Sequence, residues 1–378
     1  MPPNAFAGAQ LSIDLDAIAA NWRALGARLH GGARAGAVVK ADAYGLGMAA
    51  VAPSLHAAGC RDFFTASLDE GIALRAFLAD CRIYVFFGPG PGEAAEYSRH
   101  GLTPVLNDLG QIEIWRAHPS RGSAEQAVLQ IDTGMSRLGL APQEVARLVA
   151  QPERLAGLPI AFVMSHLACA EQPGHRMNEA QRGEFKAALG ALGPSAAAAG
   201  SSLANSSGIF LGAEFHFDLA RPGAAIYGLN PTPGNVNPMS EVVRLQGKIL
   251  QVRRVDSLRS VGYGAAHVVT RPSRIATVPV GYADGYLRSA SNRASGSIRG
   301  VQVPVVGRVS MDMITLDVTD IPLEHAQPGE PVDLIGGPHP IDALAGEAGT
   351  IGYEILTSLG RRYRRRYFEN GSEREGAA

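Results

Sequence analysis

The chain has very few cysteines and almost no net charge. Its three cysteines, Cys60, Cys81 and Cys169, are too few and too widely spaced for a disulfide framework. We therefore expect reduced, buried thiols in a cytoplasmic protein. The formal net charge of -1 argues against nucleic acid or an anionic membrane as the main partner.

Long apolar runs and metal-binding motifs are also missing from the sequence. The first residues have neither a basic region nor an apolar core, so we expect no signal peptide. No apolar run approaches membrane-spanning length. No grouping of histidine or cysteine has metal-ligand spacing. These absences favour a soluble globular protein without a metal site.

The first part of the chain alternates short apolar runs with helical patterns. With 378 residues, of which 46% are hydrophobic, the chain can form two domains. Eight apolar runs are expected as strands, at residues 37–40, 63–66, 82–87, 102–106, 127–131, 161–165, 201–204 and 217–220. Eight strands alternating with helices predict an α/β fold, a TIM-like (β/α)8 barrel over residues 1–235.

The pattern changes after a linker rich in proline and asparagine at residues 230–238. Beyond it, no long helical period separates the strand-like runs, which lie at residues 248–252, 275–280, 303–306, 313–318 and 331–335. We predict a mostly-β C-terminal domain over residues 236–378. The polar residues after Phe368 are expected to be disordered.

Polar residues follow several of the predicted barrel strands, at the ends where barrel enzymes carry their chemistry. They are Lys40, Arg137, His166, Asn205, Ser206 and Arg221. Taken singly, Lys40 is most simply a solvated lysine, His166 a structural histidine and Arg221 a surface ion-pair partner.

Together, these side chains describe a pocket with a lysine nucleophile, a guanidinium and backbone amides for an anion. Tyr44, in the turn that we expect to be exposed after Lys40, adds an aromatic plate. Pyridoxal 5′-phosphate needs such a pocket: a Schiff-base lysine, a partner for its ring nitrogen, a stacking surface and a phosphate cup.

A series of short motifs, in order along nearly the whole chain, resembles the alanine racemases of the fold-type III pyridoxal-phosphate enzymes. The motifs lie at residues 39–45, 132–139, 205–206, 221–223, 261–264, 281–286, 307–312 and 352–354. Their shared order across both predicted domains carries the resemblance.

The resemblance implies that the chain interconverts L-alanine and D-alanine with pyridoxal 5′-phosphate, for peptidoglycan synthesis or alanine catabolism. Lys40 would hold the cofactor and act as the base on one face of the substrate. Tyr263 would be the base on the opposite face, because inversion removes a proton from one side and delivers one to the other. A hydrogen bond to His166 would activate Tyr263.

Arg221 is implied to face the pyridine nitrogen, which would stay neutral because arginine keeps its own proton. The implied cofactor-binding residues are Lys40, Tyr44, His166, Asn205, Ser206, Arg221, Gly223, Ala224 and Tyr353. Those implied to bind the substrate carboxylate are Arg137 and Met311. A substrate corridor would be lined by Glu171, Tyr282, Arg288, Arg308 and Ile351. Tyr263 and Met311 would come from the partner subunit of a homodimer.

Three positions depart from the family pattern. Leu46 stands where histidine is usual, and Ser202 stands where some members have a histidine that supports the pyridine-facing arginine. Gln130 occupies the position of a carbamylated lysine in many members. Glutamine can still hydrogen-bond Arg137, but it cannot carry the negative charge. We therefore expect no carbamate.

Three alternative functions follow from the same motifs. A broad-specificity amino-acid racemase remains open, because the sequence does not give the volume of the pocket. A decarboxylase of the same fold type would need a cysteine in the second domain, and none follows Cys169. A non-catalytic pyridoxal-phosphate carrier would not need the second domain with Tyr263 and Met311.

Overall fold

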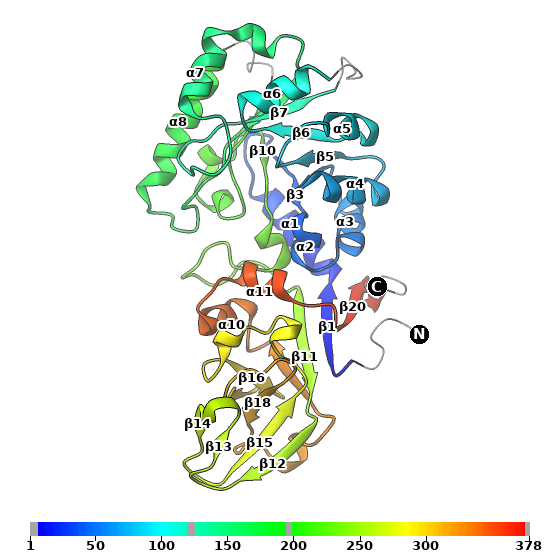
Figure 1. The fold of residues 1–378 in the computed structure, drawn as a ribbon, viewed down its shortest axis with the longest axis vertical. Helices are drawn as coiled ribbons and strands as arrows, with labels where there is room; N and C mark the ends of the chain where they lie inside the picture. The colour runs from blue at the N-terminus through cyan, green and yellow to red at the C-terminus, as the bar shows by residue number, and fades with distance from the viewer. Residues whose placement is uncertain (1–6, 119–124, 194–198, 375–378) are drawn as a thin grey trace.

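The computed structural model describes residues 7–118, 125–193 and 199–374. A barrel-shaped α/β part and a mostly-β part lie one after the other along the long axis of the molecule (Figure 1). The predicted fold class is thereby confirmed.

Seven parallel strands curve around the first part in sequence order. They are β3 (Ala37–Val38), β4 (Asp62–Thr65), β5 (Arg82–Val85), β6 (Thr103–Leu106), β7 (Ala127–Gln130), β8 (Ile160–Met164) and β9 (Gly200–Ser202). The helices outside them are α1 (Leu15–Ala27), α3 (Met48–Ala57), α4 (Leu68–Phe77), α5 (Ala94–His100), α6 (Leu109–Arg116), α7 (Pro142–Ala150) and α8 (Arg176–Leu192). Strands that pack between the barrel interior and a helix are buried on both faces, which explains why most of these sequences are largely apolar, although β9 is Gly-Ser-Ser.

The eighth strand, β10 (Leu219–Ala220), closes the barrel. It pairs in parallel with β2 (Arg34–Ala35), which leads directly into β3. On its other side, the backbone nitrogen of Arg221 donates to the carbonyl of Ala204, just after β9, at 2.8 Å. The carboxyl ends of the strands therefore meet at one mouth, where Arg221 follows β10 directly.

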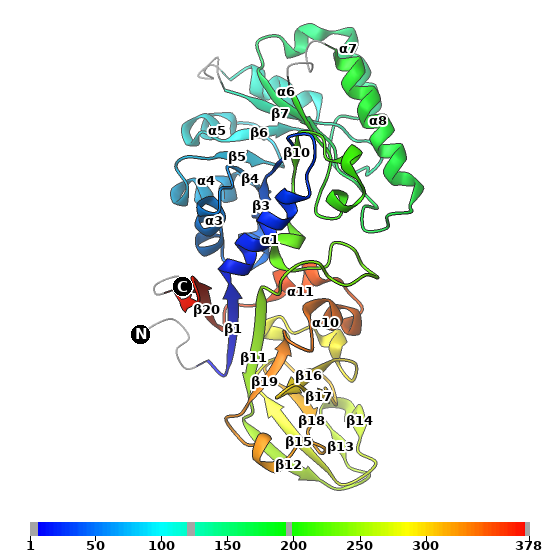
Figure 2. The same cartoon turned by 180° about the vertical axis from the view of Figure 1, so that it is seen from behind.

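The N-terminal strand β1 (Ala9–Asp14) precedes the barrel but lies in the main sheet of the mostly-β part. It pairs antiparallel with β11 (Val243–Lys248) and parallel with β20 (Arg364–Glu369), as Figure 2 shows from behind. The strand order is β17-β16-β19-β11-β1-β20-β21. The remaining members are β16 (Ser295–Ile298), β17 (Val301–Pro304), β19 (Pro331–Ile335) and β21 (Ser372–Glu373).

The mostly-β part has further elements. A three-stranded antiparallel sheet joins β12 (Gln251–Val255), β15 (Ser273–Val278) and β18 (Ile314–Asp317), and a hairpin joins β13 (Ser260–Val261) and β14 (His267–Val268). Two helices were not predicted: α11 (Gly352–Ser358) lies against the barrel mouth, and α10 (Ile341–Ala348) packs beside α11 on the side of the mostly-β part (Figure 1).

The prediction that the chain is disordered after Phe368 is wrong as far as residue 374. The backbone of β20 continues to Glu369, and β21 folds back on it with Ser372 paired to Glu369. Pairing with a neighbouring strand outweighs the polar composition here, because it satisfies the backbone groups that disorder would leave to water.

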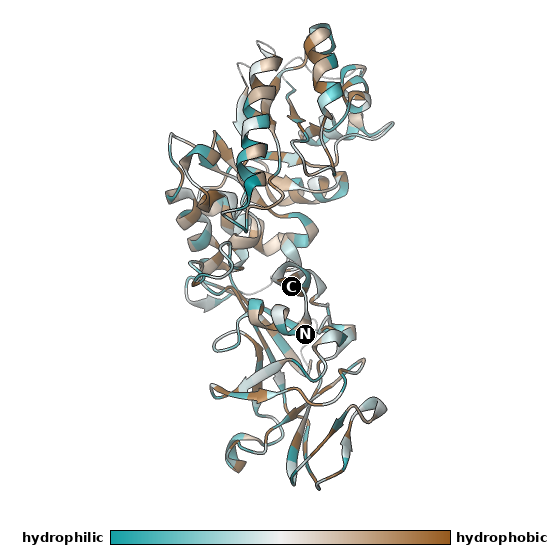
Figure 3. Ribbon diagram, turned by 90° about the vertical axis from the view of Figure 1, so that its left-hand side faces the viewer, coloured by the Kyte–Doolittle hydropathy of each residue, from teal (hydrophilic) through white to brown (hydrophobic). Residues whose placement is uncertain are grey.

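The core is continuous from the barrel into the second part. Phe64 stacks on Tyr84 at 4.8 Å and on Phe86 at 5.4 Å between ring centroids inside the barrel. The ribbon alternates hydrophobic and hydrophilic stretches along the helices, as expected for helices with one buried face (Figure 3). In the described ranges, no helix is long and apolar enough to cross a membrane, and no cluster of three potential metal ligands occurs.

The pairing of β1 with both neighbours predicts that Ile13 contributes strongly to stability. Ile13 is fully buried, so Ile13→Ala removes packed methyl groups from the junction of the two parts and should cost about 2–5 kcal/mol of unfolding free energy. Val236→Ala is the matched control, because Val236 is 92% exposed. Denaturant unfolding of both variants tests this, and an equally small loss for the two would contradict it.

Candidate active site

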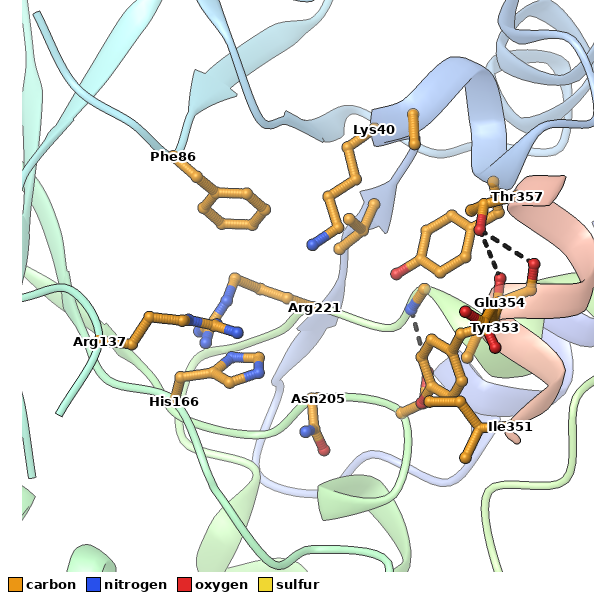
Figure 4. Close-up of a pocket in the computed structure, with 16 residues that line it drawn as sticks. Lys40, Phe86, Arg137, His166, Asn205, Arg221, Ile351, Tyr353, Glu354 and Thr357 are labelled. Atoms are coloured by element: carbon orange, nitrogen blue, oxygen red, sulfur yellow. Dashed lines mark hydrogen bonds between the residues drawn. The ribbon is translucent and has the colours of Figure 1, made fainter. Parts of the chain in front are cut away.

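A cavity of about 500 Å3 opens at the barrel mouth, where α11 meets the carboxyl ends of the strands. Figure 4 shows Lys40 reaching into it, with Arg137, Arg221 and His166 on one side and the residues of α11 on the other. The lining residues are Val38, Lys40, Ala41, Tyr44, Phe86, Arg137, His166, Asn205, Ser206, Arg221, Gly223, Ala224, Ile351, Tyr353, Glu354 and Thr357. Ten of the twelve residues predicted for the site are among them.

The turn after Lys40 has an uncommon left-handed backbone. The φ angles of Ala41, Asp42, Ala43 and Tyr44 lie between 53° and 55°. A left-handed helical conformation costs about 1–2 kcal/mol for each residue that has a Cβ atom. Four such residues in a row persist only when their surroundings hold them.

Contacts from the C-terminal strand hold the end of this turn. The Nη1 group of Arg365 donates to the carbonyl of Gly45 at 2.6 Å, and the hydroxyl of Tyr367 donates to the carbonyl of Leu46 at 2.9 Å. Leu46, one of the three positions expected to depart from the family pattern, is fully buried. Tyr44 is buried too, contrary to its expected exposure, and packs against Tyr227 with the rings tilted and their centroids 4.7 Å apart.

Arg221 is a buried cation whose hydrogen-bond partners are neutral. Its side chain is 3% exposed, and its guanidinium donates to the hydroxyl of Ser202 and, at 2.5 Å, to the carbonyl of Ser165. Within the described residues, no carboxylate pairs with it. Burial lowers the pKa of Arg221 to about 10, so the side chain is still protonated at neutral pH.

Burial and the nearby positive charges also lower the pKa values of His166 and Lys40. Burial first, and then Arg221, Arg137 and Lys40, lower the pKa of His166 to about 3, so its ring is neutral at neutral pH. Burial and then Arg137 lower the pKa of Lys40, an effect that Glu70 partly offsets. A lysine with a lowered pKa more readily supplies the free amine that a nucleophile or base requires.

Hydroxyls and backbone amides gather at the opposite side of the cavity. The Ser206 hydroxyl accepts from the backbone nitrogens of Gly223 at 3.0 Å and Ala225 at 3.2 Å. A Cβ atom on Gly223 would lie 2.3 Å from the Tyr44 hydroxyl, so only glycine fits there. Asn205 shapes the adjacent turn, because its Oδ1 accepts from the backbone nitrogen of Gly208 at 2.8 Å.

Asp132 stabilises the backbone of the loop that carries Arg137. Asp132 Oδ1 accepts from the backbone nitrogens of Gly134, Met135 and Ser136 at 2.9–3.0 Å. Gln130, which we considered as a partner for Arg137, instead donates from Nε2 to the carbonyl of Leu138 at 3.1 Å. Glutamine thus supports the loop backbone rather than the guanidinium.

Two predicted site residues, Tyr263 and Met311, do not line this cavity. Tyr263 directly follows β13 and Gly262, and β13 lies at the far end of the molecule from α2 (Lys40–Tyr44) and α11 (Figure 1). Tyr263 is 72% exposed and Met311 is 54% exposed. Tyr263 and Arg308 line a separate, open pocket.

Phe86 is a cavity residue that sequence reasoning missed. Its ring lies 6.0 Å from the ammonium nitrogen of Lys40, close enough for a cation–π contact. Phe86 falls in a predicted strand that ends at residue 87, so applying the strand-end rule to aromatic residues would have found it. Thr357 was missed as well, and its place on an unpredicted helix left no comparable signal.

These features define the class of protein, a barrel enzyme built around a partly buried lysine. Comparisons with known proteins agree. The family described as "Alanine racemase, N-terminal domain" matches residues 13–231, and "Alanine racemase, C-terminal domain" matches residues 242–367. The chain therefore belongs to the alanine racemase family, whose members are isomerases.

Individual relatives cover almost the whole chain. An alanine racemase of Rhodospirillum rubrum is 55% identical over 98% of both chains. A protein of Mesorhizobium japonicum named "Alanine racemase, catabolic" is 50% identical over 96% of this chain and 94% of its own. A crystal structure of alanine racemase from Bartonella henselae with covalently bound pyridoxal phosphate has a TM-score of 0.90 at 39% identity, covering 95% of this chain and 99% of that one.

The neutral state of His166 predicts a loss of stability in acid. An unfolded histidine titrates near 6.5, so below this pH the unfolded chain binds a proton that the folded chain, with a His166 pKa of about 3, does not bind. Between pH 7 and pH 5, the wild-type chain should therefore lose about 2 kcal/mol more than His166→Gln. Urea unfolding at both pH values measures this difference.

His56→Gln is the control for this experiment, because His56 lies outside the cavity and bonds the carbonyl of Asp80. The loss of stability in acid should persist in this variant, because it retains His166. Equal losses for all three proteins would show that His166 does not bind its proton more weakly in the folded state.

Proposed function

We propose that the chain racemises alanine with pyridoxal 5′-phosphate, using Lys40 and Tyr263 as bases on opposite faces of the substrate. One observation carries the proposal. The same cavity contains Lys40, Arg221 with its neutral hydrogen-bond partners, and a group of hydroxyls and backbone amides that could bind a phosphate. The family match adds the reaction type. The interconversion is reversible, so it supplies D-alanine for peptidoglycan or L-alanine for catabolism.

The donor set fits the cofactor. The Lys40 amine would be the covalent attachment point, and Arg221 would offer N–H groups to an unprotonated ring nitrogen. Tyr44, Ser206 and Tyr353 offer hydroxyls, and Gly223 and Ala224 offer backbone N–H groups to a phosphate, with Asn205 beside them. Burial raises the pKa of the Tyr44 hydroxyl, which therefore stays protonated and able to donate. When bound, the cofactor withdraws electrons from the substrate Cα and makes its proton acidic.

The protein's two bases then remove the proton from one face of Cα and deliver another proton to the opposite face. We assign the proton of L-alanine to Tyr263 and that of D-alanine to Lys40. The neutral ring of His166 has one donor and one acceptor nitrogen, so its N–H can donate to the deprotonated oxygen of Tyr263, the form of that side chain that can accept the proton of L-alanine. Arg137, at the edge of the cavity, holds the substrate carboxylate together with the backbone of Met311.

Tyr263 and Met311 reach the cavity only from a second copy of the chain. Both are largely exposed, and Tyr282 and Met313 are also exposed on the same part of the molecule. Several large apolar side chains exposed in one region are typical of a surface that another protein chain covers. We therefore propose a homodimer in which each chain completes the partner's site, and we place it in the cytoplasm.

The direct test of the proposed function is racemisation, followed by circular dichroism, of a panel of amino acids. L-Alanine and D-alanine should both approach zero ellipticity, and the purified enzyme should be yellow. Lys40→Ala should lose the colour and at least 10³-fold in rate, because it removes both the attachment point and one base. If alanine keeps its ellipticity, the proposal fails, and equal rates on bulkier amino acids would instead indicate a broad-specificity racemase.

Mixing two inactive variants tests whether the site is shared between subunits. After unfolding and refolding together, Lys40→Ala and Tyr263→Phe chains should regain about a quarter of the wild-type activity, since half of the dimers pair unlike chains and each of these has one intact site. Each variant refolded alone is the control and stays inactive. If the mixture regains no activity, the two bases of each site come from one chain and the proposal of a shared site is wrong.

A further inference from the structure

Glu70 makes a pair of contacts that the reaction described above does not use. It lies in the first turn of α4, where its Oε1 accepts from the backbone nitrogen of Ala41 at 2.7 Å and its Oε2 accepts from that of Ala66 at 2.8 Å. Ala41 immediately follows Lys40, and Ala66 immediately follows β4. One carboxylate therefore bridges the ends of two adjacent barrel strands.

The local sequence predicts a different role for this side chain. Ser67 and Glu70 are spaced as a capping box, in which the glutamate would reach back to the backbone nitrogen of the capping serine. Ser67 does cap α4, since its hydroxyl accepts from the backbone nitrogen of Glu70 at 3.4 Å. The Glu70 carboxylate, however, turns away from this box and points to Ala41.

The position of Ala41 explains why this contact matters. Ala41 is the first residue of the left-handed turn, with φ 53° and ψ 47°. Its nitrogen therefore lies where the backbone enters the left-handed conformation, directly after Lys40. Arg365 and Tyr367 hold the far end of the same turn. Glu70 holds the near end, directly beside the lysine.

We propose that Glu70 is a positioning residue that fixes the backbone turn after Lys40 and so aims the lysine amine at the reacting Cα. This role rests on the proposed function of Lys40. Glu70 is also the acid that opposes the effects of burial and of Arg137, raising the pKa of Lys40 while they lower it. The two influences act on the same side chain, one through geometry and one through charge.

Glu70→Gln tests the role with little change in side-chain size. A glutamine amide can accept from one of the two backbone nitrogens, but its NH2 group would face the other donor. Asp69→Asn is the matched control: it removes the same charge one residue earlier, and Asp69 is exposed and makes no hydrogen bond or ion pair with the residues that the structure describes.

The measurements are kcat, the primary isotope effects with Cα-deuterated D-alanine and L-alanine, and the visible circular dichroism of the bound cofactor. Glu70→Gln should lower kcat by about 10- to 100-fold, because a misplaced catalytic group costs rates of this order. The isotope effect should rise for D-alanine, whose proton Lys40 removes, and fall for L-alanine. The visible band should weaken, whereas Asp69→Asn should resemble the wild-type enzyme.

Wild-type behaviour of Glu70→Gln would overturn the proposal, and so would a lower kcat with both isotope effects changed equally, which indicates general damage. If Glu70→Gln does not fold, Glu70→Asp keeps the charge but is too short to bridge both nitrogens, and the same shift towards D-alanine is expected. If the wild-type enzyme does not racemise alanine, the proposed function fails. The visible circular dichroism of the bound cofactor then tests separately whether Glu70 orients Lys40: a weaker band in Glu70→Gln supports this role, and an unchanged band contradicts it.

Discussion

The cavity depends on the charge of Arg221, which is buried with no carboxylate paired to it among the residues that the structure describes. Arg221 donates to a serine hydroxyl and a backbone carbonyl, and Lys40, Arg137 and His166 line the same space. Burying a cation among neutral acceptors costs free energy, and each further cation lowers the proton affinity of its neighbours. This explains together why His166 is neutral, why the pKa of Lys40 is lowered and why the cavity suits an anionic, electron-withdrawing ligand.

The rest of the fold keeps these groups in place. Lys40 sits at the start of a strained left-handed turn, whose far end is held by side chains of β20. This strand pairs with β1, so the first strand of the chain and a strand near its C-terminus are joined beside the barrel. The mostly-β part therefore supports the lysine of its own chain, and we propose that it also supplies Tyr263 to the partner's cavity.

The barrel could be predicted because its strands are buried on both faces and read as continuous apolar runs. Once the strands were placed, the strand-end rule led to Lys40, His166 and Arg221, which the structure brings together. The left-handed turn and the contact of Glu70 with Ala41 could not be predicted. They depend on the relative placement of distant backbone groups, and local propensity argues against four left-handed residues in a row. The role of β1 in the second sheet was hidden for the same reason, because strand partners are not encoded locally.

The protonation state of the bound cofactor tests the central claim most directly. Pyridoxal 5′-phosphate labelled with ¹⁵N in its ring can be bound to the enzyme and observed by NMR. A ring nitrogen that faces a guanidinium and no carboxylate should be unprotonated, with no directly bonded hydrogen and the chemical shift of a hydrogen-bond acceptor. A protonated ring nitrogen would contradict the account, because it would require a negative partner where the structure has Arg221.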